Sequence, residues 1–335
     1  MVSHTPPRIP LAHLPTPLQK LERTSERLGC NIWVKRDDLT GSAEGGNKIR
    51  KLEYTLARAK QLGADTIITC GGVQSNHCRA TALLAAKLGF KCRLLLRGRQ
   101  ADQMQGNLLL DYTAGAEVHF YDPAYFVANL KTIAATHAAD IEAQGGSAYF
   151  IPIGASDGVG VWGYINAAAE LKADMQASAI SKADIVCATG SAGTQAGLSV
   201  GVAMHEMAAT VYGVAVCDDE AYFSAKVSED LAHWRELYGI ENYSDAELSI
   251  NTLDGYVGPG YSKAGDEIFA LITRVAREEG LVLDPVYTGK AFYGMCDQIQ
   301  NGCLGQNTDV IFVHTGGVFG LFSQAEQLQR VATGS

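Results

Sequence analysis

A lysine that stands one residue after a pair of glycines is the residue in this sequence best suited to covalent chemistry. Residues 45–53 read GGNKIRKLE, and Lys48 lies in the first turn of an expected helix. Apolar residues recur from Ile49 onward at helical spacing, which places Lys48 at the edge of a buried face. Burial and the helix dipole both disfavour the charged ammonium, so the neutral amine that Schiff-base chemistry needs becomes easier to form. The alternative is an ordinary solvated lysine beside Arg50 and Lys51, because most lysines are exposed.

A second segment with chemical potential is the loop 189–194, which reads TGSAGT between an apolar strand and a helix. Its glycines allow close backbone approach, and its N–H groups with the hydroxyls of Ser191 and Thr194 suit a phosphate. Neither the G-K-[ST] of a Walker A loop nor G-x-G-x-x-G is present, so a single terminal phosphate is favoured over a nucleotide. A glycine-rich connector that binds no ligand is the alternative.

A third segment, residues 71–77, reads GGVQSNH and also joins a strand end to a helix start. Ser75 or Asn76 suits a helix N-cap, which is the structural alternative, while the hydroxyl, amide and backbone N–H groups together suit a carboxylate. Three more polar, glycine-bearing loops lie at residues 154–158, 284–290 and 314–317. If these loops meet at one edge of a sheet, they form a cleft with a phosphate pocket, a carboxylate pocket and an amine. Pyridoxal 5′-phosphate and an amino acid require that combination.

The elements that position these loops alternate between short apolar strands and helices almost throughout the chain. The expected strands are residues 31–36, 66–70, 92–96, 117–121, 148–153, 184–188, 210–216 and 310–314. The expected helices are residues 47–62, 75–88, 125–143, 159–175, 192–207, 222–238 and 265–279. Strands that are apolar on both faces and joined by helices indicate an α/β fold with parallel sheets covered on both sides. Glycine-bearing loops near residues 47 and 154 favour a division there, into a large domain (1–47 and 155–335) and a small domain (48–154).

The composition favours a cytosolic enzyme or binding protein of about two domains. The 335 residues include 27 Lys and Arg against 36 Asp and Glu, and the resulting charge of −9 gives no attraction to nucleic acid or to an anionic membrane. The apolar runs are too short to span a bilayer, and the N-terminal residues resemble neither a secretory signal nor a transit peptide. Eight cysteines stand singly and the histidines form no metal motif. This pattern favours buried thiols in the reducing cytoplasm, with no bound metal.

With all these loops in view, the chain resembles the fold-type II pyridoxal-phosphate enzymes, specifically the D-cysteine desulfhydrase and 1-aminocyclopropane-1-carboxylate (ACC) deaminase family. The similar segments read KRDD, GGNKxRKLE, QSNH, TGSAGT, DPVYTGK and HTGG, and they run in order from about residue 16 to residue 317. The resemblance implies two three-layer αβα domains of the tryptophan synthase β-like type. It also implies a pyridoxal 5′-phosphate cofactor, a small amino-acid substrate and a homodimer.

The same resemblance assigns roles to individual residues. It implies that Lys48 bonds covalently to the cofactor and removes the Cα proton of the substrate, while Tyr287 stacks beside the pyridine ring and assists a proton transfer. A catalytic role is also implied for Ser75. The implied cofactor contacts are Lys48, Asn76, Thr189, Gly190, Ser191, Ala192, Gly193, Thr194, Tyr287, Thr288 and Thr315. The implied substrate contacts are Ser75, Asn76, His77 and Tyr261.

Two threonines separate the branches of this family. The deaminase pattern resembles DPVYEGK and HLGG, whereas this chain has Thr288 and Thr315 at those places. A glutamate beside the ring nitrogen would help keep it protonated, while a threonine hydroxyl can donate to a neutral nitrogen and leaves a weaker electron sink. A weaker sink suits elimination of a thiolate better than opening of a cyclopropane. We therefore expect a carbon–sulfur lyase of the D-cysteine desulfhydrase type, which releases pyruvate, hydrogen sulfide and ammonia.

Several other functions remain open from the sequence. Elimination of sulfite from L-cysteate would need a basic group near the β-substituent, and His77 is the one candidate. Elimination from D-serine or β-chloroalanine, ACC deamination and a non-catalytic amino-acid-binding protein are further alternatives. An NAD-type dehydrogenase is disfavoured, because G-x-G-x-x-G and a following acidic residue are absent. No motif spacing encodes whether the substrate is a D- or an L-amino acid.

Overall fold

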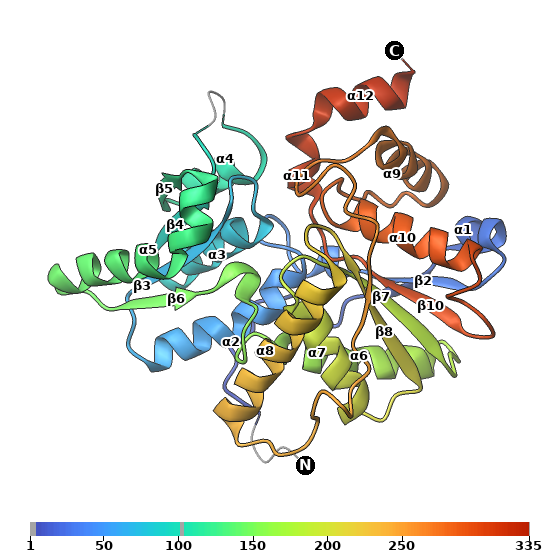
Figure 1. Ribbon diagram of the computed structural model, residues 1–335, viewed down its shortest axis with the longest axis horizontal. Coiled ribbons are helices and arrows are strands. Elements are labelled where there is room, and N and C mark those ends of the chain that lie inside the picture. The colour runs from blue at the N-terminus through green and yellow to red at the C-terminus, as the bar shows by residue number, and fades with distance from the viewer. Residues whose placement is uncertain (1–4, 101–103, 335) are drawn as a thin grey trace.

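Two mainly parallel sheets form the framework of the protein, as shown by a computed structural model that describes residues 5–100 and 104–334 (Figure 1). The six strands of the larger sheet are, in spatial order, β1 (Leu18–Lys20), β2 (Ile32–Lys35), β10 (Asp309–Val313), β7 (Ala183–Thr189), β8 (Ala209–Ala215) and β9 (Asn251–Leu253). The four strands of the smaller sheet are β5 (Glu117–Tyr121), β4 (Lys91–Arg97), β3 (Thr66–Gly72) and β6 (Ala148–Ile151). Within the described residues, only the β1–β2 pair is antiparallel.

Helices cover both sheets. Those that surround the larger sheet are α1 (Glu22–Leu28), α6 (Trp162–Ala177), α7 (Gly193–Met204), α8 (Glu220–Tyr238), α9 (Asp266–Glu279), α10 (Thr288–Gln300), α11 (Val318–Phe322) and α12 (Ala325–Thr333). Those of the smaller sheet are α3 (Asn76–Leu88), α4 (Gly106–Thr113) and α5 (Pro123–Ala143). Helix α2 (Asn47–Gln61) packs against both α6 and α3, and two 3₁₀ turns lie at Asp37–Leu39 and Ile153–Ala155.

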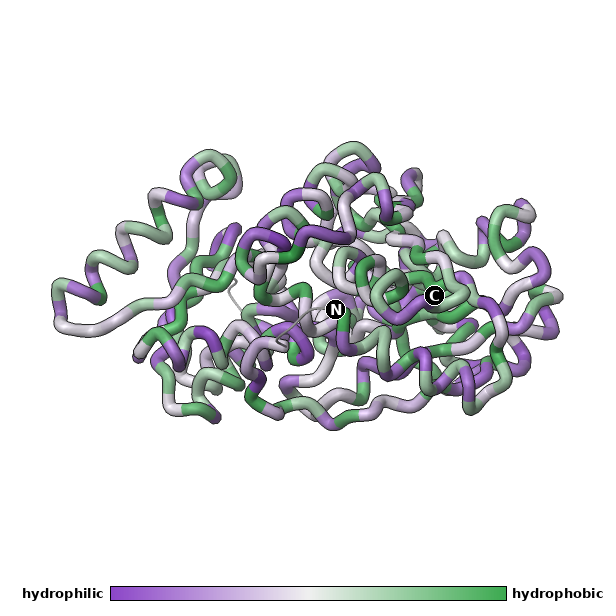
Figure 2. The backbone as a smooth tube through the Cα atoms, turned by 90° about the horizontal axis from the view of Figure 1, so that it is seen from below, coloured by the Kyte–Doolittle hydropathy of each residue, from purple (hydrophilic) through white to green (hydrophobic). Residues whose placement is uncertain are grey.

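Strand β7 shows why the sheets are covered on both faces. Successive side chains of a strand point to opposite faces, and here both sets are apolar. Ile185 and Cys187 belong to one hydrophobic cluster, while Val186 and Ala188 belong to another on the other side of the sheet. The two sheets lie side by side along the long axis of the molecule (Figure 1), and the backbone seen from below shows the same two parts at left and right (Figure 2). The expected α/β fold, with parallel sheets covered on both faces, is therefore confirmed.

The expected elements agree closely with the observed ones. The eight expected strands are β2–β8 and β10, with ends shifted by at most two residues, and the seven expected helices are α2, α3 and α5–α9, with ends shifted by at most three. Two edge strands of three residues each, β1 and β9, were not predicted, because three residues are too few to show the apolar–polar alternation that identifies a strand. The short helices α1, α4, α11 and α12 were not predicted either.

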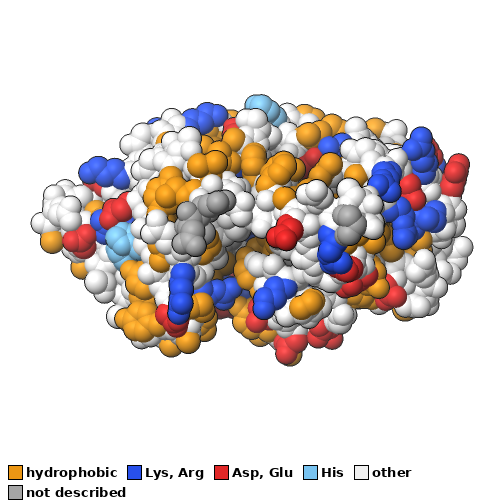
Figure 3. Space-filling view, turned by 90° about the horizontal axis from the view of Figure 1, so that it is seen from above, with side chains coloured by type: hydrophobic (Ala, Val, Ile, Leu, Met, Phe, Trp, Pro, Cys, Tyr) orange, Lys and Arg blue, Asp and Glu red, His pale blue; other side chains and the backbone are white. Residues whose placement is uncertain are grey.

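The proposed division of the chain follows the two sheets. The chain leaves the larger sheet after β2, passes through α2 into the smaller sheet, and returns after β6 to build the remainder of the larger one. We retain boundaries at residues 47/48 and 154/155 as a proposal that this path supports. The surface is hollowed between the two parts of the molecule, with Lys and Arg side chains on both sides of the hollow (Figure 3).

Three observations bear on the expectations from composition. No helix in the described part of the chain is long and apolar enough to cross a membrane. Residues 5–100 and 104–334 hold no group of three or more His, Cys, Asp and Glu side chains arranged to bind a metal ion. All eight cysteines are free thiols, and five of them are buried.

Candidate active site

The diglycine before Lys48 lets two loops come into direct backbone contact. Gly46 has a φ of +117°, and a Cβ there would lie 2.9 Å from the carbonyl oxygen of Thr315. That same oxygen accepts a hydrogen bond of 3.0 Å from the N–H of Asn47, the first residue of α2. Only glycine combines this φ with this close approach. The contact holds the start of α2, and with it Lys48, against the loop that follows β10.

Lys48 projects into a cavity, and its amine is easier to deprotonate than that of an ordinary lysine. Burial lowers the pKa of Lys48 from 10.5 to about 8. The two flanking basic residues, Arg50 and Lys51, are themselves buried, at 2% and 0% exposure. The alternative of a solvated lysine in a solvated basic turn is therefore wrong.

Lys51 is a second cation at this site, and sequence reasoning missed it. Its Nζ donates to Ser156 Oγ at 3.2 Å, and Ser156 Oγ in turn donates to Ser191 Oγ at 2.8 Å. Burial first, and the charge of Lys48 second, hold the pKa of Lys51 well below its usual range. The spacing of three residues from Lys48 puts both lysines on the same side of α2, which is the signal that could have revealed it.

The loop after β7 brings the expected phosphate-binding groups to the cavity. Thr189, Ser191 and Thr194 all line it, and Thr194 Oγ1 accepts a hydrogen bond of 3.0 Å from Asn47 Nδ2. The hydroxyl of Thr189 is buried without a partner among the described residues. Gly193 does not line the cavity, because its N–H points to Ser156 Oγ at 3.2 Å and a Cβ there would collide with that serine. The expected contact of Gly193 with the phosphate is therefore not supported.

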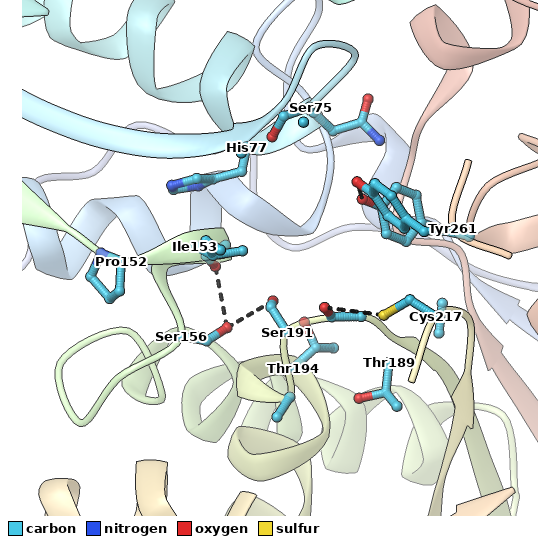
Figure 4. Close-up of a pocket in the computed structure, with 18 of the residues that line it drawn as sticks. Ser75, His77, Pro152, Ile153, Ser156, Thr189, Ser191, Thr194, Cys217 and Tyr261 are labelled. Atoms are coloured by element: carbon cyan, nitrogen blue, oxygen red, sulfur yellow. Dashed lines mark hydrogen bonds between the residues drawn. The ribbon is translucent and has the colours of Figure 1, made fainter. Parts of the chain in front are cut away.

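The loop after β3 faces the cavity from the smaller sheet. Ser75 is the N-cap of α3, accepting from the N–H of Cys78 at 3.2 Å, and it also lines the cavity together with Asn76. Ser75 is therefore an N-cap that also lines the cavity, and its contact with a substrate carboxylate stays a prediction. In Figure 4, Ser75 and His77 face Ser156 and Ser191 from the opposite side of the cavity.

His77 is a buried, neutral histidine whose Nδ1 has no hydrogen to donate. Thr69 Oγ1 donates to the carbonyl oxygen of Ile151 at 2.7 Å and lies 2.7 Å from His77 Nε2, so Nε2 carries the proton. The buried Nδ1 then has no hydrogen and no partner among the described residues. Burial first, then the charges of Lys48 and Lys51, lower the pKa of His77 well below its usual value. A neutral imidazole of this tautomer cannot donate from Nδ1 to a substrate carboxylate, which weakens the expected role of His77.

Two tyrosines close the cavity on a third side. The hydroxyl oxygens of Tyr261 and Tyr287 are 2.6 Å apart, and their rings meet edge to face at 73°. Burial and the neighbouring Tyr261 raise the pKa of Tyr287 well above its usual range, so its hydroxyl stays protonated. A Cβ at Gly190 would lie 3.0 Å from the Tyr287 ring, so the ring packs closely on the loop after β7. Both tyrosines line the cavity, as the resemblance implied.

The two threonines that separate the branches differ in position. Thr315 lines the cavity. Thr288 is fully buried behind the wall, where its hydroxyl donates to Asp284 Oδ1 at 2.7 Å and accepts from the N–H of Asp284 at 2.8 Å. Its proton is thus committed to a buried carboxylate, which also accepts from the backbone N–H groups of residues 286–288 and shapes the turn that presents Tyr287. The expected contact of Thr288 with the cofactor ring is not supported.

The residues present fit pyridoxal phosphate. The cavity measures about 430 Å³, within the usual range for a small-ligand site. Its lining includes an amine with a lowered pKa, the hydroxyl of Ser191 and the loop at the N-terminus of α7, behind which the Lys51 amine is hydrogen-bonded to Ser156. A dianionic phosphate would accept hydrogen bonds from this loop, and its charge would favour the protonated form of Lys51.

Comparison with known proteins also points to pyridoxal phosphate as the cofactor. A family model described as "Pyridoxal-phosphate dependent enzyme" matches residues 9–316. The chain belongs to that family.

Individual relatives narrow the comparison. A "Putative 1-aminocyclopropane-1-carboxylate deaminase" of Thermotoga maritima is 43% identical over 96% of this chain and 99% of its own. A "D-cysteine desulfhydrase" of Klebsiella pneumoniae is 41% identical over 95% of this chain and 96% of its own. The crystal structure of an "ACC deaminase homologue" superposes with a TM-score of 0.89 at 38% identity, covering 97% of this chain and 96% of that one. These matches confirm the expected fold-type II family and its pyridoxal-phosphate cofactor.

Proposed function

We propose that this protein catalyses the β-elimination of D-cysteine, with water, to pyruvate, hydrogen sulfide and ammonia. The observation that carries the proposal is the lowered pKa of Lys48, whose amine shares one cavity with a carboxylate-type loop and a protonated tyrosine. When bound, the cofactor supplies an electron sink that weakens the bonds at Cα of an amino acid.

Each residue would then have a definite task. The neutral amine of Lys48 takes the Cα proton, while Ser75 and Asn76 hold the substrate carboxylate through their side chains and the N-terminus of α3. Tyr287 keeps its proton and donates it where negative charge develops. Lys51, Ser191 and Thr189 would hold the phosphate of the cofactor.

The choice of a carbon–sulfur lyase over a deaminase is supported by Thr288, which stands where the deaminase pattern has a glutamate. Without that carboxylate the ring nitrogen lacks the partner that would keep it protonated, and a neutral ring suits the departure of a good leaving group. Thr315, which lines the cavity, stands where the deaminase pattern has a leucine. Relatives at about 40% identity carry both names, "D-cysteine desulfhydrase" and "Putative 1-aminocyclopropane-1-carboxylate deaminase". We also propose a cytoplasmic homodimer, which light scattering tests as a mass twice that of one chain.

A substrate panel tests the proposal. We expect the purified holoenzyme to release pyruvate and sulfide from D-cysteine faster than any product from L-cysteine or ACC. Lys48→Ala should abolish turnover and remove the visible absorbance of the bound cofactor, because no other amine lies in its place. Faster release of 2-oxobutyrate from ACC, or a colourless protein that binds D-cysteine without turnover, would contradict the proposal.

A further inference from the structure

Arg97 is a cavity residue to which the proposed elimination gives no task. It is the last residue of β4 and is the register partner of Gly72 on the neighbouring strand β3, three residues before Ser75. Its guanidinium carbon lies 5.3 Å from the centre of the Tyr261 ring, and a Cβ at Gly72 would lie 3.4 Å from that same ring. The side chain therefore lies in the corner between the carboxylate-type loop and the tyrosine pair.

No described residue pairs with the charge of Arg97. Within residues 5–100 and 104–334 it makes no hydrogen bond or ion pair, and its one contact of note is with the Tyr261 ring. Lys226, another cation on the wall, is by contrast paired with Glu229 and Asp230. A wall carboxylate, Asp218, is exposed. A guanidinium with uncommitted N–H groups in a ligand cavity is suited to an anion with several oxygens.

The cofactor phosphate and the substrate carboxylate already have candidate partners at this site. The loop after β7, with the Lys51 amine behind it, suits the phosphate, and the start of α3 suits the carboxylate. Arg97 is a third group that can bind an anion, and neither of these two anions requires it. His77, the basic residue that the sequence offered for a further anion, is neutral, and its Nδ1 has no hydrogen to donate. Arg97 therefore replaces it as the basic group near the reacting end of the substrate.

We propose that Arg97 binds the β-substituent of the substrate, and that the site accepts amino acids whose β-substituent is an anion, a sulfonate above all. The inference rests on the proposed β-elimination and extends its substrate class. With cysteate, Lys48 takes the Cα proton and the Cβ–S bond breaks, its electron pair leaving with sulfite. One water then converts the remaining three-carbon enamine to pyruvate and ammonium.

Two substrates of different charge test this role. Kinetics of pyruvate release are measured with D- and L-cysteate and with β-chloroalanine, which has the same backbone and an uncharged β-substituent. Arg97→Gln should raise KM for the reactive cysteate enantiomer at least about tenfold, the worth of one charged hydrogen bond, and leave KM for β-chloroalanine within about twofold. Arg97→Lys keeps the positive charge, so its KM for cysteate should lie close to that of the unsubstituted enzyme. Arg99→Gln, an exposed arginine two residues further on, is the matched control.

A binding measurement separates this inference from the elimination itself. 3-Sulfopropanoate carries both acidic groups but no amine, so it binds without reacting, and calorimetry should show at least tenfold weaker binding to Arg97→Gln. If Arg97→Gln raises KM equally for cysteate and for β-chloroalanine, Arg97 binds the carboxylate that both substrates share, and the inference is wrong. It is also wrong if β-chloroalanine is consumed while cysteate and 3-sulfopropanoate are ignored. If neither amino acid reacts, yet Arg97→Gln binds 3-sulfopropanoate more weakly than the unsubstituted protein, the proposed β-elimination is wrong and the proposed anion site is supported.

Discussion

Lys48 and Lys51 form a pair of buried amines whose protonation governs what the cavity can bind. Lys48 is partly exposed to the cavity, whereas Lys51 is fully buried behind it. Burial lowers the pKa of both, so the unliganded site holds less positive charge than two ordinary lysines would carry. An incoming phosphate dianion would reverse this for Lys51, because an adjacent negative charge favours the ammonium.

The rate of cofactor uptake should follow the titration of Lys48. A lysine with a lowered pKa is neutral above about pH 8 instead of above 10.5, so at pH 7 its neutral amine is roughly 300 times more abundant than in free lysine. We predict that uptake of pyridoxal phosphate by the cofactor-free protein, followed by absorbance, accelerates with pH and levels off above a midpoint near 8. A midpoint above about 10 would show that Lys48 is an ordinary solvated lysine.

Lys51 should contribute to phosphate affinity and not to the covalent step. Lys51→Met removes the ammonium beside Ser156 and Ser191, so we predict at least about tenfold weaker binding of pyridoxal phosphate and of inorganic phosphate, measured by calorimetry. Lys60→Met, at an exposed lysine of the same helix, is the control and should bind both ligands normally. Unchanged phosphate binding in Lys51→Met would remove Lys51 from the phosphate site.

At the level of elements, α3 supports the loop that precedes α2. Arg79 of α3 is 2% exposed, donates to the carbonyl oxygen of Gly45 at 2.7 Å and lies 4.9 Å over the ring of Phe319. Asp111 of α4 is the acidic neighbour of Arg79, and its buried oxygens have no hydrogen bond among the described residues. Burial raises the pKa of Asp111 to about 8. Three segments that are distant in sequence thus meet behind the Lys48 turn.

Removing Arg79 should cost stability and disturb the Lys48 turn together. Arg79→Met leaves the carbonyl oxygen of Gly45 without its hydrogen bond, so we predict a loss of about 1–3 kcal/mol in the free energy of unfolding, measured with urea. The double variant Arg79→Met with Asp111→Leu should regain part of that loss, since it also removes the two buried carboxyl oxygens of Asp111 that have no hydrogen bond among the described residues. Cofactor affinity should stay reduced in both variants, because the hydrogen bond to Gly45 is absent. Equal instability of the single and double variants would contradict this account.

At the level of the whole molecule, the cavity lies where the chain returns from the smaller sheet to the larger one. Gly154 lies in the 3₁₀ turn after β6 and has a φ of +69°. A Cβ there would collide with the Ser191 hydroxyl and lie 3.3 Å from Lys48 Nζ. The crossing point of the chain is therefore also a wall of the site, which couples the placement of the two sheets to the cofactor pocket.

Gly154→Ala should strain the backbone and also obstruct the cofactor pocket, and comparison with a control glycine distinguishes these two effects. We predict at least about tenfold weaker cofactor binding together with a loss of about 1–3 kcal/mol in stability, measured by absorbance titration and by urea unfolding. Gly145→Ala is the matched control, because Gly145 has a φ of +82° but open space around it. That control should lose stability and keep its cofactor affinity. Normal cofactor binding in Gly154→Ala would show that this turn moves away from the pocket.

Local patterns in the chain were enough to predict the elements and the reactive groups. Strands 66–70 and 184–188 and helix 47–62 were predictable because an apolar period of 2 or 3.6 residues is a local property. Local spacing made Lys48 a candidate reactive amine, and glycines and hydroxyls at strand ends made the loops near residues 75 and 191 candidate ligand loops. The roles proposed for them came from the resemblance. The resemblance to a pyridoxal-phosphate family rested on the same local motifs.

Which groups face the cavity, and in what protonation state, depends on the packing of distant segments. Thr288 and Gly193 both belong to sequence motifs that predict contact with the cofactor. In the structure, however, the hydroxyl of Thr288 donates to the buried carboxylate of Asp284, and the N–H of Gly193 donates to Ser156. Arg97 resembles an ordinary strand-end arginine until Gly72 and Tyr261 place it in the cavity. Direction, burial and charge neutralisation arise from contacts between segments far apart in sequence, and no local pattern records them.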